Sequence, residues 1–207
     1  MKIVVLASGG VDSSLAMLML KERGHSIIPL HVNYGHLAEE REWKSCQAVC
    51  RHLDLPNPVR ISISGMECIP SGLINSNLDI VEAAFLPTRN LLFATLGASY
   101  AHSVQSRVIA LGILANPIFP DQTPDFLRKA ELCLSSALGV DIKILTPLIE
   151  LDKRDVLKLA RAHGLPIELT YFCHAGTEQP CGNCISCKER KSAEESIMSS
   201  IGSTVSR

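Results

Sequence analysis

Short apolar runs alternate with segments of helical spacing along most of the chain. The apolar runs predict strands at 2–7, 26–33, 59–63, 107–114 and 143–145. The segments with helical spacing predict helices at 12–23, 38–53, 91–102, 124–138 and 152–163. The run at 26–33 is largely apolar without alternation, as in strands covered on both faces of a sheet. Strands that alternate with helices predict an α/β fold built on a doubly wound, five-stranded parallel sheet.

Capping residues and irregular stretches separate these elements. Thr123 and Asp152 precede helical segments and are good N-caps, because their side-chain oxygens accept hydrogen bonds from free N–H groups. Gly139 follows a helical segment, where a left-handed residue commonly ends a helix. The stretches 64–88 and 115–124 lack periodicity and contain proline and asparagine. A long irregular stretch in a compact domain is usually functional or mobile, so both are candidates to border a site.

The predicted sheet brings several polar stretches to one edge. Ligands of doubly wound sheets bind beyond the carboxyl ends of the strands. The turn at Ser8, residues 31–36 and 114–124, and Thr146 all follow or end predicted strands. We therefore expect these stretches to form a common ligand site.

Residues 3–14 hold the clearest chemical signal, an apolar strand followed by Ser-Gly-Gly and the start of a helix. The glycines allow positive φ and close approach of a ligand to the backbone. Free N–H groups and the dipole of the helix start favour phosphate. Ser8, Ser13 and Ser14 add hydroxyl donors, and Asp12 suits a metal ion that phosphates carry. The turn matches neither a Walker loop nor a Gly-x-Gly-x-x-Gly turn, and taken alone an ordinary strand-to-helix turn also explains it.

Four of the eight cysteines gather near the C-terminal end. Cys181, Cys184 and Cys187 recur at every third position, with Cys173 eight residues upstream. This spacing is typical of tetrahedral thiolate sites. A closed site within one compact segment favours Zn²⁺, although iron–sulfur clusters use the same triple spacing. We expect a small metal-binding appendage here, with zinc as the preferred ion.

A second pair of cysteines, Cys46 and Cys50, lies one helical turn apart on the predicted helix 38–53. A metal pair is one interpretation of this spacing. The apolar neighbours of both residues favour buried small side chains instead.

Composition and charge narrow the function classes. The chain has 207 residues and a formal net charge of −1. A near-neutral charge predicts no extended basic face, so we expect no strong nucleic-acid binding. No apolar run reaches the length that crosses a membrane, and the N-terminus begins with a strand pattern rather than a secretory signal. We therefore expect a cytoplasmic protein with no membrane partner, large enough for one core and a small appendage.

Three stretches together resemble the 7-cyano-7-deazaguanine synthase family of the ATP pyrophosphatase (PP-loop) superfamily. They are Ser8-Gly9-Gly10-Val11-Asp12-Ser13, Phe85-Leu86-Pro87-Thr88-Arg89-Asn90, and Cys173 with Cys181-x-x-Cys184-x-x-Cys187. Asn33-Tyr34-Gly35-His36 and Thr146-Pro147-Leu148 match the family in place as well. The resemblance implies a Rossmann-like, adenine nucleotide alpha hydrolase-like fold. It also implies an ATP pyrophosphatase domain at 1–169, followed by a zinc-binding tail and C-terminal helix at 170–207.

The resemblance implies an ATP-dependent carbon–nitrogen ligase that forms AMP and pyrophosphate. Such an enzyme adenylates the carboxylate of 7-carboxy-7-deazaguanine, and ammonia then gives the amide. A second ATP-dependent activation with loss of water gives the nitrile, 7-cyano-7-deazaguanine, a precursor of queuosine. The implied cofactors are ATP, Mg²⁺ and Zn²⁺. The implied partners are the small deazapurine acid, ammonia and a second copy of the chain in a homodimer.

Site residues also follow from the resemblance. The implied nucleotide loop comprises Ala7, Ser8, Gly9, Gly10, Val11, Asp12, Ser13 and Ser14. The implied catalytic residues are Asp12, which positions Mg²⁺, Ser13, and Arg89, which clamps a phosphate or carboxylate. The implied substrate-binding residues are His31, Tyr34, Arg89, Asn90 and Asp121. The implied metal ligands are Cys173, Cys181, Cys184 and Cys187.

The chain departs from the family pattern in two places. Residues 116–121 read Asn-Pro-Ile-Phe-Pro-Asp where the family usually has an Asp-Tyr-Ser-Gly-Tyr-Pro-Asp segment, and Val11 replaces a commonly polar residue. The substrate half is therefore less closely matched than the nucleotide half. Three alternatives stay open: a paralogue that transfers a deazapurine acid to another amine such as one on a protein, a tRNA thiolation enzyme, and a non-catalytic nucleotide-binding module.

Overall fold

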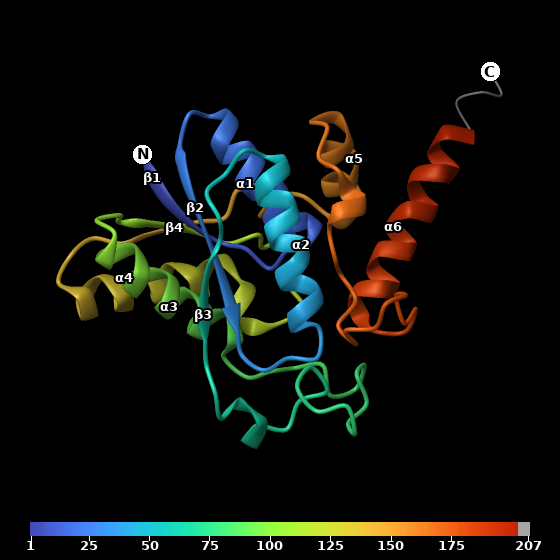
Figure 1. Cartoon of the computed structure of the whole chain (residues 1–207), viewed down its shortest axis with the longest axis horizontal. Helices are drawn as coiled ribbons and strands as arrows, with labels where there is room; N and C mark the ends of the chain where they lie inside the picture. The colour runs from blue at the N-terminus through green and yellow to red at the C-terminus, as the bar shows by residue number, and fades with distance from the viewer. Residues whose placement is uncertain (203–207) are drawn as a thin grey trace.

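The computed structural model describes residues 1–202, in which five strands form one parallel sheet (Figure 1). The strands are β1 (Lys2–Leu6), β2 (Ser26–Asn33), β3 (Val59–Ser62), β4 (Val108–Ala110) and β5 (Lys143–Leu145). The helices are α1 (Val11–Glu22), α2 (Glu39–His52), α3 (Arg89–Ser103), α4 (Pro124–Leu138), α5 (Lys153–Ala162) and α6 (Ile185–Gly202). Short 3₁₀ helices lie at Met66–Cys68, Pro120–Gln122 and Ile167–Leu169. The predicted fold class is confirmed.

The strand order β3-β2-β1-β4-β5 places the first strand at the centre of the sheet. β1 pairs in parallel with β2 on one side and with β4 on the other. The chain moves outward from β1 to β3 and then crosses to β4, on the opposite side of β1. Because the segments after β1 and β4 turn to opposite faces, a crevice opens between them at the carboxyl edge of the sheet.

Alternation within β1 builds one core on each face of the sheet. Ile3 and Val5 pack with residues of α1, α2 and α5, whereas Val4 and Leu6 pack with residues of α3 and α4. All four side chains are buried. Burial on both faces explains why the strand reads as an apolar run without polar alternation. Full burial of an aliphatic side chain contributes about 1.5–3 kcal/mol, so these layers hold the central strand firmly.

Several local predictions agree with the structure. The Thr123 and Asp152 side chains accept N–H groups of the helices that follow, and Gly139 ends α4 with φ of 66°. Cys46 and Cys50 are buried in the core beneath α2, as small apolar side chains would be. The bounds of β2, α4 and β5 match the predicted ones. Each of these features rests on signals within a few residues of the sequence.

The predicted strand 107–114 ends early, at Ala110. The residues beyond it leave the sheet and pass beside the turn that follows β1. At Gly112 the approach is so close that a Cβ would lie 2.9 Å from the backbone nitrogen of Ser13. The chain therefore leaves the strand in order to border the crevice.

The starts of α3 and α6 are not set by local spacing, and α3 begins two residues earlier than predicted. α3 starts at Arg89, because the carboxylate of Asp121, from a distant loop, accepts the N–H of Asn90 at 2.9 Å. α6 starts at Ile185, between Cys184 and Cys187, so its first turn lies inside the cysteine cluster. In both places a tertiary contact or cluster defines the helix start, which local spacing does not reveal.

The irregular stretch 64–88 carries turns and the short helix Met66–Cys68. It is anchored by Leu73 and Leu86, which are buried and pack with Tyr34. Leu73 also accepts the N–H of Leu37 at 2.9 Å through its carbonyl oxygen. The stretch therefore packs against the residues that follow β2.

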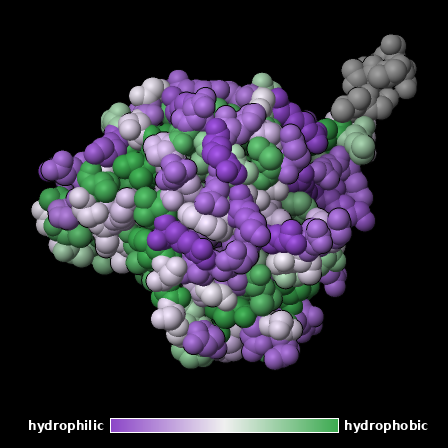
Figure 2. Space-filling model, in the orientation of Figure 1, coloured by the Kyte–Doolittle hydropathy of each residue, from purple (hydrophilic) through white to green (hydrophobic). Residues whose placement is uncertain are grey.

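The surface is mainly polar in the view of Figure 2, where hydrophilic residues cover most of the face and apolar residues form separate patches. Within residues 1–202, no helix is both long enough and apolar enough to cross a membrane. Among the large apolar side chains, Ile118 and Met198 are exposed.

We predict that Gly9→Ala destabilises the protein more than Gly139→Ala. Both glycines have positive φ, which alone costs an alanine about 1–2 kcal/mol. A Cβ on Gly9 would also lie 2.6 Å from the backbone nitrogen of Cys46, whereas none of the described residues approaches that of Gly139 within 4 Å. The overlap should add about 1–3 kcal/mol to the loss, measured as the free energy of unfolding in denaturant. Equal losses for the two variants would contradict the prediction.

Candidate functional site

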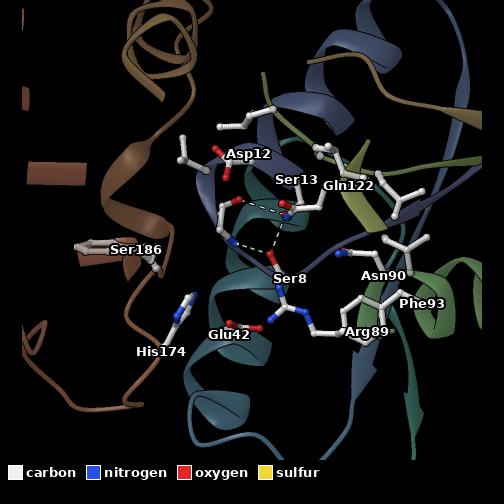
Figure 3. Close-up of a pocket in the computed structure, with 18 of the residues that line it drawn as sticks. Ser8, Asp12, Ser13, Glu42, Arg89, Asn90, Phe93, Gln122, His174 and Ser186 are labelled. Carbon is white, nitrogen blue, oxygen red and sulfur yellow. Dashed lines mark hydrogen bonds between the residues drawn. The ribbon is translucent and has the colours of Figure 1, made fainter. Parts of the chain in front are cut away.

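A pocket of about 300 Å³ opens at the carboxyl edge of the sheet. The ends of β1, β2 and β4, the first turns of α1 and α3, and the segment before α6 line it. Figure 3 shows side chains converging from these sides, with Ser8 and Asp12 on the first turn, Arg89 and Asn90 on α3, and His174 on the segment before α6. Ligands of doubly wound sheets bind at this position.

The turn after β1 presents backbone N–H groups at the start of α1. Gly10 is the N-cap, and within residues 1–202 no side chain caps this helix. Ser13 Oγ donates to the carbonyl oxygen of Gly10 at 3.1 Å and lies 3.2 Å from Ser8 Oγ. Free N–H groups at a helix start, together with hydroxyls, suit an anion such as phosphate.

Most residues of the predicted nucleotide loop line the pocket. These residues are Ala7, Ser8, Gly10, Val11, Asp12 and Ser13. Gly9 instead packs against the backbone of α2 with φ of 84°. Ser14 is fully buried and donates its hydroxyl to the carbonyl oxygen of Gly10 at 2.8 Å. Gly9 and Ser14 therefore shape the turn from behind.

Asp12 is paired with a lysine outside the predicted site. Lys153, the first residue of α5, places Nζ 2.8 and 2.6 Å from the two carboxylate oxygens of Asp12 and 3.5 Å from Glu189 Oε2. The lysine side chain is 11% exposed and that of Asp12 is 28% exposed. Burial works to lower the pKa of Lys153, but Asp12 and Glu189 hold it above its usual value. The charged lysine thus joins the start of α1 to α6.

Arg89 and Asn90 line the pocket from the start of α3. Thr88 before them has φ of 60°, an unusual backbone conformation for a β-branched residue. Asp121 is buried behind this turn, and its two carboxylate oxygens accept the backbone N–H and the Nδ2 group of Asn90, each at 2.9 Å. The structure therefore places Asp121 as an anchor for the start of α3 rather than in the pocket lining.

β2 and the residues after it supply three rings to the pocket. His31 is buried and its Nδ1 donates to the carbonyl oxygen of Ala7 at 2.9 Å. Burial lowers the pKa of His31, which therefore stays neutral near pH 7. Tyr34 stacks on His36 with the ring centroids 4.2 Å apart, and burial raises the pKa of Tyr34. These contacts restrict the orientation of all three rings.

Glu42 of α2 completes this wall. Its Oε2 accepts a hydrogen bond from His36 Nε2 at 3.0 Å, and its side chain is 18% exposed. Burial works to raise the pKa of Glu42, but the hydrogen bond and charge interaction with His36 hold it below its usual value. Glu42 is therefore ionised, and Figure 3 shows its carboxylate in the space between Arg89 and His174.

The segment before α6 forms the remaining wall. Tyr171, Phe172 and His174 line the pocket. The N–H of Tyr171 donates to the carbonyl oxygen of Gly9 at 3.0 Å. Burial lowers the pKa of His174 to about 4, so this ring is neutral near pH 7. This backbone hydrogen bond holds the segment against the turn after β1.

The four predicted cysteine ligands lie together next to this wall. Their Sγ atoms are all within 4.8 Å of one another, and Cys173, Cys184 and Cys187 are buried. The N–H of Cys181 donates to Cys173 Sγ at 3.2 Å. Burial works to raise the pKa of Cys173, but this N–H and that of Ala175 bring it to about 7. A cluster of four sulfurs with N–H donors fits a thiolate-bound metal ion.

Sequence reasoning missed Lys153, Glu42 and the wall at Tyr171. Asp152 predicted the helix start that carries Lys153, but the contact to Asp12 spans 141 positions. Glu42 is one of several acidic residues on a charged helix, and local spacing does not distinguish it from the others. The sequence held a usable signal only for Lys153. The start of α5 follows β5, and the carboxyl end of β5 lies at the sheet edge where the pocket opens.

Comparisons with known proteins agree with the family resemblance. Residues 2–198 match the family model described as "Queuosine biosynthesis protein QueC". A 7-cyano-7-deazaguanine synthase from Nautilia profundicola is 33% identical over 202 residues, which cover 91% of each chain. One from Nitratiruptor sp. is 34% identical over 203 residues, which cover 92% of each chain.

Among solved structures, a 4-thiouridine synthetase in complex with RNA and ATP superposes with a TM-score of 0.58. It is 16% identical, and the match covers 94% of this chain and 50% of that one. At this identity the likeness supports the fold alone.

We predict that Lys153→Met lowers the free energy of unfolding by about 1–2 kcal/mol, because it removes the charged partner of a half-buried carboxylate. Lys191→Met is the matched control, since Lys191 is exposed and pairs with Glu195 at 3.9 Å on the surface of α6. Its stability should not change measurably. Chemical denaturation of both variants tests this, and equal stability of the two would refute the role given to Lys153.

Proposed function

The chain belongs to the family of queuosine biosynthesis protein QueC, and we propose that it is an ATP-dependent ligase that makes 7-cyano-7-deazaguanine from 7-carboxy-7-deazaguanine and ammonia. The carboxylate of the acid attacks the α-phosphorus of ATP, pyrophosphate leaves, and an acyl adenylate forms. Ammonia displaces AMP to give the amide. A second ATP-dependent activation removes water and gives the nitrile. The observation that best supports this proposal is the start of α1, which has no side-chain cap and faces a pocket that Arg89 also lines.

The nucleotide half of the proposal rests on the turn after β1. Pyrophosphate carries the largest negative charge among the products, and fixed N–H donors stabilise such charge without reorganisation. The hydroxyls of Ser8 and Ser13 add donors beside them. Leu30 and Ile113 line the same pocket and offer apolar surface for the flat base of ATP.

Asp12 is the residue that would hold the Mg²⁺ carried by ATP. Its carboxylate lines the pocket, and hard oxygen ligands suit this ion. When bound, Mg²⁺ supplies charge stabilisation to the leaving pyrophosphate. Lys153 contacts both oxygens of Asp12 in this structure, so the ion and the lysine compete for the same carboxylate. Glu189 lies near enough to retain the lysine when Asp12 turns to the ion.

The substrate half rests on α3 and the end of β2. Arg89 is placed to bind the carboxylate of the acid or the α-phosphate, as guanidinium groups bind both bidentately. Asn90 is oriented by Asp121 and offers its amide to the base edge. His31 and Tyr34 border the same space. We assign these residues to binding of the deazapurine acid.

For the cysteine cluster we propose Zn²⁺ as the resident ion. Cys173, Cys181, Cys184 and Cys187 supply a closed set of four thiolates, which leaves no open position for catalysis. The ion would tie the segment before α6 to the first turn of α6. We propose that residues 170–207 serve as this zinc-binding tail and residues 1–169 as the ATP pyrophosphatase domain.

One observation favours a second candidate, transfer of the activated acid to an amine other than ammonia. Residues 116–121 differ from the segment that the family usually has at this place. Asn116, Pro117 and Ile118 line the pocket at this point, and Ile118 is 58% exposed. An exposed apolar residue at the pocket entrance suits a larger acceptor such as an amine on a protein.

We predict that 7-carboxy-7-deazaguanine, ammonium and MgATP yield AMP, pyrophosphate and the nitrile, detected by mass spectrometry. Asp12→Ala should lower the rate of pyrophosphate release by at least about 100-fold, because charge on the leaving group loses its stabilisation. Asp125→Ala, on the exposed face of α4, is the control and should keep the rate. AMP formation without nitrile would favour the second candidate, and absence of AMP formation with the acid would refute the proposed ligase.

We predict that Cys184→Ser lowers both the bound zinc and the melting temperature. Cys184 is fully buried in the cluster, and loss of one thiolate opens the closed site. Cys133→Ser is the control, because Cys133 is exposed and lies outside the cluster. Elemental analysis and thermal unfolding measure the two effects. An unchanged zinc content in Cys184→Ser, or iron with sulfide in the purified protein, would contradict the assignment.

A further inference from the structure

Glu42 is a pocket carboxylate that the steps above leave without a role. Among the described residues, the acidic side chains that line the pocket are Asp12, Glu42 and Glu189. Asp12 and Glu189 both pair with Lys153. Glu42 pairs with His36 instead, and within residues 1–202 it forms no ion pair with a lysine or arginine. It therefore offers the pocket an anionic group that no lysine or arginine of the described residues neutralises.

The position of Glu42 is fixed relative to the phosphate-binding turn. Its backbone carbonyl packs against Gly9 so closely that a Cβ there would overlap it. On the other side, His36 is 6% exposed and its ring is held by the stack with Tyr34. The carboxylate is thus preorganised, which a group that acts on a reacting atom requires.

Two of the rings around Glu42 present buried acceptor atoms. His31 uses Nδ1 to donate to the backbone, so its Nε2 is left as a buried acceptor with no partner in the described part of the chain. The neutral ring of His36 donates to Glu42 through Nε2, so its Nδ1 is also a buried acceptor without a partner there. Buried acceptors without donors are uncommon and point to a ligand that brings N–H groups.

We propose that Glu42 binds ammonium in this pocket and acts as the base for its nitrogen as the C–N bond forms, with His36 as the positioning residue. The inference rests on the proposed function and adds to it the binding site of the second substrate. Ammonia is mainly ammonium at neutral pH, so a carboxylate without a lysine or arginine partner is the group that attracts it. A small cation with four N–H donors also matches the acceptors around Glu42.

In the proposed step, bound ammonium first releases one proton to water and becomes ammonia. The lone pair of ammonia forms the C–N bond at the acyl carbon, and the bond from that carbon to the AMP oxygen breaks, with the electron pair leaving on AMP. The nitrogen then carries one proton too many, and this proton is far more acidic than those of free ammonium. Glu42 takes it and later passes it to water, which leaves the neutral amide.

The role of His36 follows from the groups that face Glu42. These are His31 on β2, Tyr34 and His36 after it, Cys46 on α2, Arg89 on α3 and His174 before α6 (Figure 3). His36 is the group that donates a hydrogen bond to the carboxylate. Without that donor, burial would raise the pKa of Glu42, so less of it would be ionised at acid pH.

The test compares wild type with Glu42→Gln in two reactions of the same acyl adenylate. With ammonium, the kcat/KM for amide formation should fall by more than about 100-fold, because the variant loses both a general base, which usually contributes at least this much, and the charge that attracts the cation. With hydroxylamine, which is uncharged near pH 7, hydroxamate formation should fall less, because only the base is lost. Pyrophosphate release with the acid should stay near the wild-type rate. The remaining ammonium activity of the variant should rise with pH in step with free ammonia.

Two further variants complete the experiment. Glu22→Gln is the matched control, because Glu22 forms a comparable pair with His163 at 2.8 Å, outside the pocket lining. It should behave as wild type in both reactions. His36→Leu removes the donor to Glu42. This variant should lose amide formation at acid pH and recover as the pH rises, because a higher pH restores the ionised carboxylate. It leaves Glu42 in place, so the test does not depend on the folding of Glu42→Gln.

Four results would overturn the inference. The first is an unchanged kcat/KM for ammonium in Glu42→Gln, and the second is an equal loss with hydroxylamine. The third is a raised KM for the acid with an unaltered response to ammonium, which would make Glu42 part of acid recognition. The fourth is a wild-type protein that releases no pyrophosphate with the acid, which refutes the proposed function itself and is distinguishable from the other three.

Discussion

The close packing of the turn at Gly9 holds the pocket together. The backbone of α2 fills the space that a side chain would need, and the N–H of Tyr171 donates to the carbonyl oxygen of Gly9 at 3.0 Å. On the other side of the turn, a Cβ on Gly112 would lie 2.9 Å from the backbone nitrogen of Ser13. Three segments far apart in the sequence therefore define one turn. Because their contacts are backbone to backbone, the start of α1 and the pocket walls have little freedom to shift relative to one another.

Charge pairing allows so many ionisable groups to share this pocket. A buried carboxylate or ammonium group is costly unless a partner compensates it. Asp12 and Glu189 share Lys153, and Glu42 has His36. Lys153 places a positive charge beside the carboxylates at one end of the pocket, whereas His36 gives a hydrogen bond to the carboxylate at the other end. The two ends of the pocket therefore present different groups to a ligand.

The cysteine cluster and the pocket share structural elements. The first turns of α6 carry both Cys187, in the cluster, and Glu189, which reaches Lys153. The segment between Cys173 and α6 also carries His174 into the pocket. A metal ion or contact that orders the cluster therefore also orders the pocket wall at His174 and the position of Glu189 beside Lys153. The cluster is therefore placed to influence the pocket through His174 and Glu189, which it positions.

The sequence by itself determined the sheet, the bounds of β2, α4 and β5, the glycine turn after β1 and the four-cysteine cluster. These features depend on periodicity, caps and spacing within a few residues, which are local properties. Only the tertiary structure decided that Lys153 holds Asp12 and that Glu42 enters the pocket. It also decided that Asp121 anchors Asn90 from behind. These contacts join residues 31 to 141 positions apart or depend on how α2 and α5 pack on the sheet, and no local pattern encodes that packing.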